Sequence, residues 1–188
     1  MREGDQGRLR IIGGRWRSRK LAFPDQADLR PTPDRVRETL FNWLQTGLAG
    51  RRCLDLFAGS GALGFEAASR GAAEVVMVEN SPEAASALAR NIELLEAGSV
   101  ELVVADALAW LTNYDQPGFD IVFLDPPFST GLLGRCCQLL EDGQALAGDA
   151  KIYIEHAAVD DEVVIPDGWE CLKARSAGQV VYKLFSRA

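Results

Sequence analysis

Short apolar runs alternate with amphipathic stretches along most of the chain after residue 50. Strand-like runs lie at 53–57, 75–79, 100–105, 121–125 and 151–155, and stretches with helical spacing lie between them at 62–70, 82–95, 108–114 and 132–140. Strands that alternate with helices are typical of a parallel sheet with helices on both faces. The pattern therefore predicts an α/β fold.

The end of the chain breaks this alternation. Two strand-like runs, at 169–174 and 180–185, are joined across Gly178 without an intervening helix, so we expect the last strand to be antiparallel. Helix boundaries are also marked in the sequence. Gly71 follows the first helix of the α/β region, and Ser81 and Pro82 precede the second as an N-cap and a first helical residue.

The first part of the chain has a different pattern. Two apolar stretches within residues 9–23 flank Gly13-Gly14, a pair that can close a β-hairpin. A helix is predicted after Arg30, with Thr32 as the N-cap and Pro33 as its first residue. We therefore divide the chain into a basic hairpin extension, residues 1–30, and a main domain, residues 31–188.

The charge is distributed unevenly. The chain has 188 residues, 47% of them apolar, which suits one domain with a substantial core. A net charge of −7 argues by itself against an anionic partner, but residues 1–20 contain seven basic and two acidic residues. Such a basic segment is typical of phosphate binding, and its alternative is a solvated, partly disordered terminus.

Other protein classes are less compatible with the sequence. No apolar run reaches the roughly 18 residues that span a bilayer, and the N-terminus has no apolar stretch like that of a signal peptide, so we expect a cytoplasmic protein. The four cysteines form no C-x-x-C pair, and the only histidine is His156. Neither a disulfide framework nor a metal site is predicted.

A glycine-rich turn follows the first strand of the α/β region. Gly59, Gly61 and Gly64 form the pattern G-x-G-x-x-G, and Glu79 follows Gly59 by 20 residues at the end of the next strand. This arrangement is typical of sites for nucleoside-containing cofactors and suits both a nicotinamide dinucleotide and S-adenosylmethionine. Asp55, just before the turn, favours the cationic S-adenosylmethionine over an anionic pyrophosphate.

Two more acidic residues follow strand-like runs. Asp106 can accept a hydrogen bond from an adenine amino group, and it can equally be a helix N-cap. Asp125 begins the tetrapeptide Asp125-Pro126-Pro127-Phe128, whose prolines predict a rigid loop at the carboxyl edge of the sheet. Its carboxylate and the Pro126 carbonyl can hold the amino group of a nucleobase on which Phe128 stacks.

In this order, the segments DLFAGSGALG, VMVEN, VVADA and FLDPPF resemble the class I methyltransferases that act on nucleobase amino groups. With RIIGGRWRSRKL and RPTPDRVRETLFNWL at the start, nearly the whole chain resembles the RsmD family of 16S rRNA guanine-N2 methyltransferases. The resemblance implies a Rossmann-like fold with a seven-stranded sheet, S-adenosylmethionine as cofactor, and 16S rRNA of the small ribosomal subunit as partner.

The resemblance also implies roles for individual residues. Asp55 and the glycine turn would hold the methionine end of the cofactor, Glu79 its ribose and Asp106 its adenine, and Arg30 with Thr32 would close over its carboxylate. The full set expected at the cofactor is Asp55, Phe57, Gly59, Ser60, Gly61, Glu79, Asn80, Asp106, Ala107, Arg30 and Thr32. The expected catalytic residues are Asp125, Pro126, Pro127 and Phe128.

The basic extension is expected to contact the RNA. The expected contacts are Arg8, Arg10, Arg15, Arg17, Arg19 and Lys20 for phosphates and Trp16 for an unpaired base. Because the chain has no room for a large target-recognition domain, we expect the small subunit or an assembly intermediate to supply much of the specificity. We also expect the protein to be a monomer.

Several alternatives remain at this stage. Methylation of adenine N6 in RNA or DNA uses the same tetrapeptide, and an RNA-binding assembly factor can keep the fold without the chemistry. An oxidoreductase with a nicotinamide cofactor shares the glycine turn, but Asp55 and the tetrapeptide disfavour it. His156, which follows a strand, is more readily explained as a structural residue than as a general base.

Overall fold

The computed structural model describes residues 6–24, 31–127, 131–159 and 163–187. Within these ranges the chain forms nine strands and five helices. The strands are β1 (Gln6–Arg10), β2 (Lys20–Pro24), β3 (Arg52–Asp55), β4 (Glu74–Glu79), β5 (Val100–Val104), β6 (Phe119–Leu124), β7 (Leu146–Ala157), β8 (Trp169–Ala177) and β9 (Val180–Arg187). The helices are α1 (Asp34–Trp43), α2 (Ala62–Ser69), α3 (Pro82–Leu95), α4 (Ala107–Thr112) and α5 (Leu132–Asp142).

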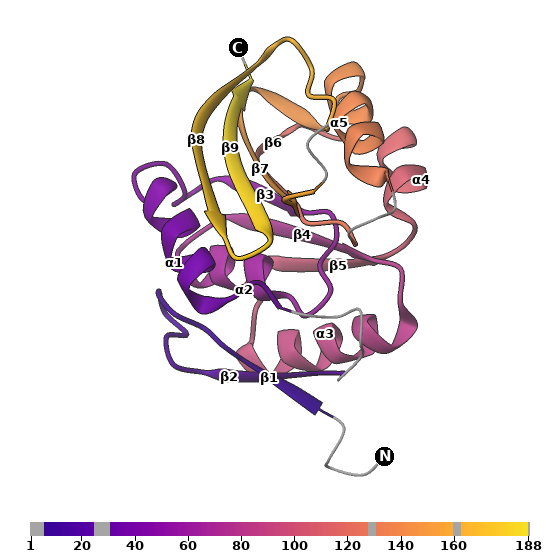
Figure 1. Cartoon of the computed structure of the whole chain (residues 1–188). Coiled ribbons are helices and arrows are strands. Elements are labelled where there is room, and N and C mark those ends of the chain that lie inside the picture. The colour runs from indigo at the N-terminus through magenta and orange to yellow at the C-terminus, as the bar shows by residue number, and fades with distance from the viewer. Residues whose placement is uncertain (1–5, 25–30, 128–130, 160–162, 188) are drawn as a thin grey trace.

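The α/β prediction is confirmed by a seven-stranded sheet of order β5-β4-β3-β6-β7-β9-β8. Strands β3 to β7 pair in parallel, whereas β9 pairs antiparallel with both β7 and β8. One apolar cluster joins this sheet to α1, α2 and α3, and a second joins it to α4 and α5. Figure 1 shows α4 and α5 together, away from α1. Helices therefore cover the parallel part of the sheet on both faces.

The predicted hairpin is present, but its turn is different. Strands β1 and β2 pair up to Arg10 and Lys20, so residues 11–19 form a long connection instead of a tight turn at the glycine pair. This connection docks on the end of α2, where Arg15 N donates to Ser69 O (2.8 Å) and Ser69 Oγ donates to Gly13 O (2.6 Å). Gly14 has φ +74°, and a β-carbon there would collide with the backbone of Ser69. The glycines thus permit a close approach to α2.

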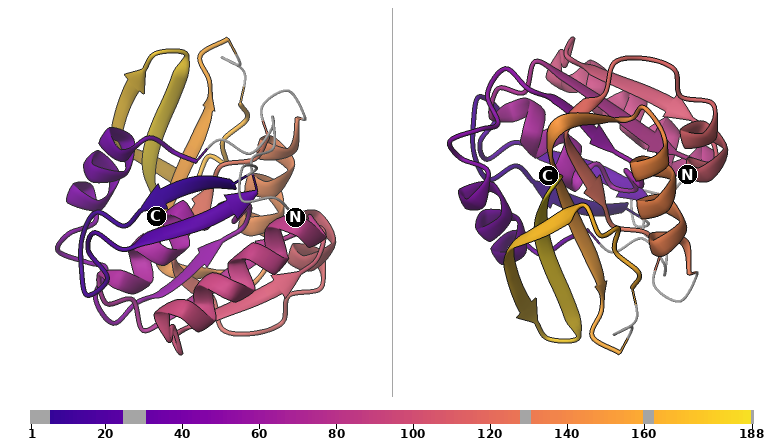
Figure 2. Two further views of the ribbon diagram at one scale, coloured as in Figure 1. Left: turned by 90° about the horizontal axis from the view of Figure 1, so that it is seen from below. Right: turned by 90° about the horizontal axis from the view of Figure 1, so that it is seen from above.

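The hairpin lies beside α3, as Figures 1 and 2 show. Asn91 of α3 donates from Nδ2 to Ala22 O of β2 (2.9 Å). The buried side chains of Leu9, Leu21 and Phe23 belong to the same apolar cluster as α2 and α3. Apolar contact and hydrogen bonding therefore anchor the described part of the extension to the main domain.

Helix boundaries largely follow the sequence signals. Ser81 caps α3 by accepting from Ala84 N (3.3 Å), and Pro82 follows it. Thr32 as the N-cap of α1 is wrong, because Pro33 holds that position and the helix begins at Asp34. The Thr32 hydroxyl instead donates to Asp125 Oδ2 (3.3 Å), a partner distant in sequence. None of the helices in the described ranges is long and apolar enough to cross a membrane.

Candidate active site

Acidic residues stand at the carboxyl ends of five neighbouring strands. Because the strands are parallel and in register, these ends meet at one edge of the sheet. Following the sheet from β5 to β7, the acids are Asp106, Glu79, Asp55, Asp125 and Glu155. Four of them are site residues predicted from the sequence, and their common edge follows from strand order.

The glycine turn between β3 and α2 lies in the middle of this row. Gly59 and Gly61 both have positive φ, of 52° and 79°. A β-carbon on Gly61 would lie 2.5 Å from the ring of Phe65 and 2.7 Å from Leu88, so only glycine fits. Glu79 fixes the turn by accepting from Gly59 N (2.7 Å) and from Ser81 N (2.7 Å). The turn is therefore tied to the end of β4.

Asp55 is a buried carboxyl, 3% exposed. It accepts one hydrogen bond, from Gly64 N (2.9 Å), and none of the ion pairs between described residues involves it. Burial raises the pKa of Asp55 to about 7, with a further contribution from the charge of Glu79, against the lowering effect of the Gly64 N–H. A carboxylate in this position favours a cationic ligand.

Asp125 follows directly after β6 and is partly exposed. Pro126 is buried and Pro127 is exposed, while Phe128 and Arg30 lie outside the described residues. Because Thr32 donates to Asp125, the segment before α1 lies against the Asp125 loop. The structure thus brings Thr32 beside the expected catalytic residue, although we had expected it at the cofactor.

The remaining residues expected at the cofactor surround the same edge. Asp106 is exposed and caps α4, since its Oδ1 accepts from Ala109 N (2.9 Å). This confirms the N-cap interpretation and leaves Oδ2 for another partner. Ser60 and Ala107 are buried, Phe57 is half-buried and Asn80 is exposed.

Glu155 is a member of the row that sequence analysis did not assign to the site. It is 4% exposed, and its Oε2 accepts from the Tyr153 hydroxyl (2.9 Å). An acid at the end of an apolar strand was the available signal, the same one that marked Asp55 and Glu79. The next residue, His156, is buried with Nδ1 2.9 Å from Ala157 O, while Nε2 has no partner among the described residues.

The six basic residues expected to contact phosphates are exposed around the hairpin. Arg10 pairs with Asp34 (2.9 Å), whereas Arg15 and Arg19 donate to the carbonyls of Glu96 and Leu94 at the end of α3. Arg8, Arg17 and Lys20 are exposed. Trp16 does not fit the expected base-stacking role, because it is 6% exposed within the apolar cluster. Its ring packs under Arg15 (4.3 Å), so we correct it to a core residue.

Buried charges connect the extension to the active site. The guanidinium of Arg37, 1% exposed, donates to Arg10 O (2.9 Å), to Asp34 (2.6 Å) and, through Nε, to Thr32 O (3.2 Å). It also lies 3.5 Å from Glu66, a fully buried carboxylate of α2. Arg37 therefore holds the segment that carries Thr32, next to Asp125.

The charge of the acidic row limits which ligands can bind there. None of the ion pairs between described residues involves Asp55, Glu79, Asp125 or Glu155. Carboxylates without a cation repel a pyrophosphate and attract an ammonium or sulfonium group. Together with the glycine turn, the site fits a cationic nucleoside better than a dinucleotide.

Comparisons with known proteins agree with this interpretation. Residues 9–186 match the family described as conserved hypothetical protein 95. Ribosomal RNA small subunit methyltransferase D of Escherichia coli (strain K12) is 46% identical over 181 residues, covering 96% of this chain and 91% of the relative. The protein of the same name from Haemophilus influenzae is 43% identical over 183 residues, covering 96% and 94%.

A solved structure shows the same fold over nearly the full length. The Escherichia coli protein yhhF matches with a TM-score of 0.90 and 44% sequence identity, covering 96% of this chain and 98% of that one. The family match and the identities both extend over almost all of the chain. The chain therefore belongs to the RsmD family of methyltransferases.

Proposed function

We propose that this protein transfers a methyl group from S-adenosylmethionine to the exocyclic N2 amine of a guanine in 16S rRNA. The observation that carries the proposal is the row of strand-end carboxylates beside the glycine turn, in which no ion pair between described residues involves Asp55 or Asp125. The names of the relatives, ribosomal RNA small subunit methyltransferase D, support rRNA of the small subunit as the substrate.

The cofactor would lie across the ends of β3, β4 and β5. When bound, S-adenosylmethionine supplies the activated methyl group on its sulfonium. Asp55 and the turn at Gly59–Gly61 would hold the methionine end, and Glu79 would accept from the ribose hydroxyls. Asp106 would accept from adenine, and the neighbouring positions Phe57, Ser60, Asn80 and Ala107 would line the same site. Arg30 and Thr32 would close over the carboxylate of the cofactor.

The target base would enter beside Asp125. An exocyclic amine is a weak nucleophile because its lone pair is delocalised into the ring. The Asp125 carboxylate and the Pro126 carbonyl would accept from its two N–H groups and direct the lone pair at the methyl carbon, while Pro127 and Phe128 hold the plane of the base. Catalysis would consist mainly of positioning and exclusion of water.

The extension, residues 1–30, would bind the phosphates of the RNA next to the main domain, residues 31–188. Because the described hairpin packs on α2 and α3, its basic surface has a defined orientation relative to the active site. We propose that the protein acts as a monomer on the small subunit or an assembly intermediate, where RNA tertiary structure presents an unstacked guanine.

The location of the methyl group in the product tests this function. We expect small-subunit RNA incubated with the protein and isotope-labelled S-adenosylmethionine to carry the label on one guanine, detected by mass spectrometry of nuclease fragments. Both naked 16S rRNA and intact subunits should be offered. A labelled methyladenine would contradict the guanine assignment, and absence of label in both substrates would contradict the activity.

Replacing Arg8, Arg17 and Lys20 with glutamate should weaken RNA binding and flatten its dependence on salt, because fewer counterions are released. The structure favours these three over Arg15 and Arg19, which also hold α3. Binding isotherms at several salt concentrations measure the slope, and S-adenosylhomocysteine binding should be nearly unchanged. Equal losses of RNA and cofactor binding would instead show that the extension acts on folding.

A further inference from the structure

Asp125 and Glu155 are neighbours because of the register of β6 and β7. Leu124 pairs with Ile154 in this parallel ladder, so the next residues, Asp125 and Glu155, continue side by side beyond it. Neighbouring strands lie about 4.8 Å apart, and residues in register point to the same face. The two carboxyl groups therefore emerge next to each other on the α1 side of the sheet.

The two carboxyls have different surroundings. Glu155 is 4% exposed and accepts from Tyr153, whose own side chain is fully buried. Asp125 is partly exposed and accepts from Thr32. Glu155 is thus enclosed, and Asp125 is the more accessible of the two carboxyls.

Ionisable groups on the neighbouring strands also surround this pair. Asp55 approaches from β3, with Glu79 behind it on β4, and Tyr182 of β9 packs on Tyr153 with ring centroids 6.5 Å apart. His156 projects to the opposite face of β7. None of the ion pairs between described residues places a cation on Asp125 or Glu155.

Two neighbouring carboxyls in such a setting do not ionise independently. Burial, then the charge of Glu155, then that of Asp55 raise the pKa of Asp125, whereas the Thr32 hydrogen bond lowers it. Burial likewise raises the pKa of Glu155, against the hydrogen bond from Tyr153. Glu155 and Thr32 therefore act on Asp125 in opposite directions.

We propose that Glu155 is a positioning residue for methyl transfer. Its carboxyl group, side by side with that of Asp125, sets the charge of Asp125, and the hydrogen bond from Thr32 acts on that charge in the opposite direction. This inference rests on the proposed function. The amine lone pair forms the new N–C bond while the C–S bond breaks and its electrons stay on sulfur. The methylated amine then gives up one proton, and the charged Asp125 carboxylate accepts it before releasing it to solvent.

Opposite shifts of the pH–rate profile test the proposal. With saturating cofactor and RNA, Glu155→Gln should move the acidic limb of kcat to lower pH, because the repelling charge is gone. At the pH where kcat of the wild type is half its maximum, kcat of this variant should be close to its own maximum. The relative rates of the two proteins should therefore differ about twofold at that pH. Thr32→Val should move the acidic limb of kcat to higher pH, so that its kcat is below half its own maximum at the same pH. Glu170→Gln, on the exposed part of β8, is the matched control.

A second measurement on the free protein does not depend on activity. The ¹³C carboxyl resonance of Asp125, assigned with Asp125→Asn, should titrate at lower pH in Glu155→Gln and at higher pH in Thr32→Val than in the wild type. Unchanged titration of Asp125 in both variants would overturn the inference even if the wild type methylates guanine. A wild type that transfers no methyl group, with the shifts present, would overturn the proposed function alone.

Discussion

Asp125→Asn is expected to reduce methyl transfer by about 10²–10⁴-fold, the range that a positioned proton-accepting group contributes. Asparagine keeps the shape of aspartate but removes the charge that accepts from the base amine. Among the described residues, the neighbouring carboxyls are those of Glu155 and Asp55, and both are buried, so neither is placed to substitute for Asp125. Single-turnover transfer of labelled methyl to small-subunit RNA measures the loss.

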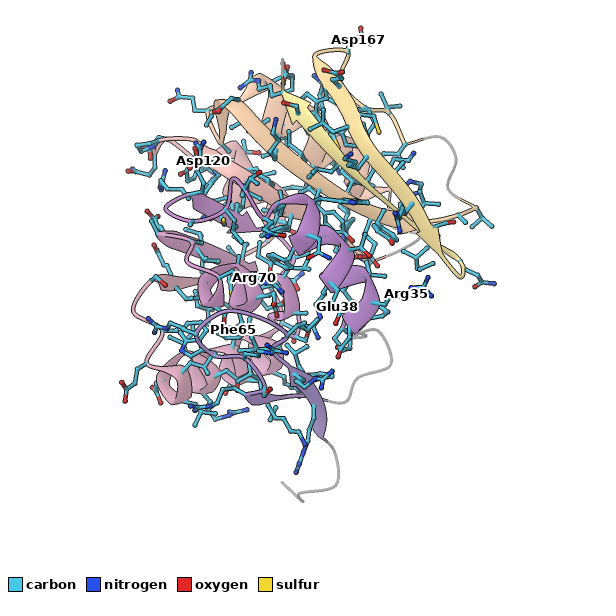
Figure 3. All side chains as sticks on the ribbon, turned by 90° about the vertical axis from the view of Figure 1, so that its left-hand side faces the viewer. Arg35, Glu38, Phe65, Arg70, Asp120 and Asp167 are labelled. Carbon is cyan, nitrogen blue, oxygen red and sulfur yellow. The ribbon has the colours of Figure 1, made fainter. Side chains whose placement is uncertain are left out.

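This loss should not reflect unfolding. The pKa of Asp125 is raised above its ordinary value in the folded protein, so charging this group as the pH rises costs stability in the native state. A neutral asparagine removes that cost, and thermal unfolding at pH 8 should show equal or greater stability. Asp167→Asn, in the exposed turn that precedes β8 (Figure 3), serves as the matched control. An Asp125→Asn protein with full activity would refute the catalytic assignment.

Glu66→Ala should destabilise the protein by about 3–5 kcal/mol, the cost of breaking a buried ion pair from one side. The Glu66 carboxylate is fully buried and accepts from the backbone N–H groups of Ile12 and Gly13 (2.8 Å each) and from Arg70 Nε (2.7 Å). Its removal would leave these donors unsatisfied and Arg37 without one of its partners. Figure 3 shows Arg70, which follows α2, beside α1, where it lies over the ring of Phe41 (5.1 Å).

Urea denaturation at pH 7 measures this effect. Glu38→Ala is the matched control because Glu38 is exposed on α1, and its substitution should change the unfolding free energy by less than about 0.5 kcal/mol. Limited proteolysis should in addition release the extension first in Glu66→Ala, since the connection between β1 and β2 loses its anchor. A loss as small as that of the control would show that other contacts dock the hairpin.

The order of elements and four members of the acidic row could be predicted from the sequence. Apolar periodicity identifies strands and helices because burial is repeated along each element. An acid directly after an apolar run, as at Asp55 and Asp125, is visible without structure. Glu155 carried the same signal at the end of β7, and its side-by-side placement with Asp125 depends on strand order and register.

Contacts between distant segments could not be predicted. Thr32 has the sequence context of an N-cap, but its partner Asp125 is 93 residues away. The glycine pair at 13 and 14 suggests a tight turn, whereas its surroundings are set by Ser69 of α2. Trp16 has basic neighbours in sequence, yet its ring is buried because the hairpin packs on the helices. In each case the local structure is determined by a contact with residues that are distant in the sequence.

The sequence by itself determined the alternation of strands and helices, the glycine turn, the placement of acids at strand ends and the charge separation between extension and main domain. These properties depend on neighbouring residues, whose spacing is fixed by covalent geometry. Only the tertiary structure decided that Glu155 lies beside Asp125 and that Thr32 donates a hydrogen bond to Asp125. It also decided that Glu66 and Arg37 anchor the extension. Such contacts arise from strand order, register and packing, which bring together residues that the sequence keeps apart.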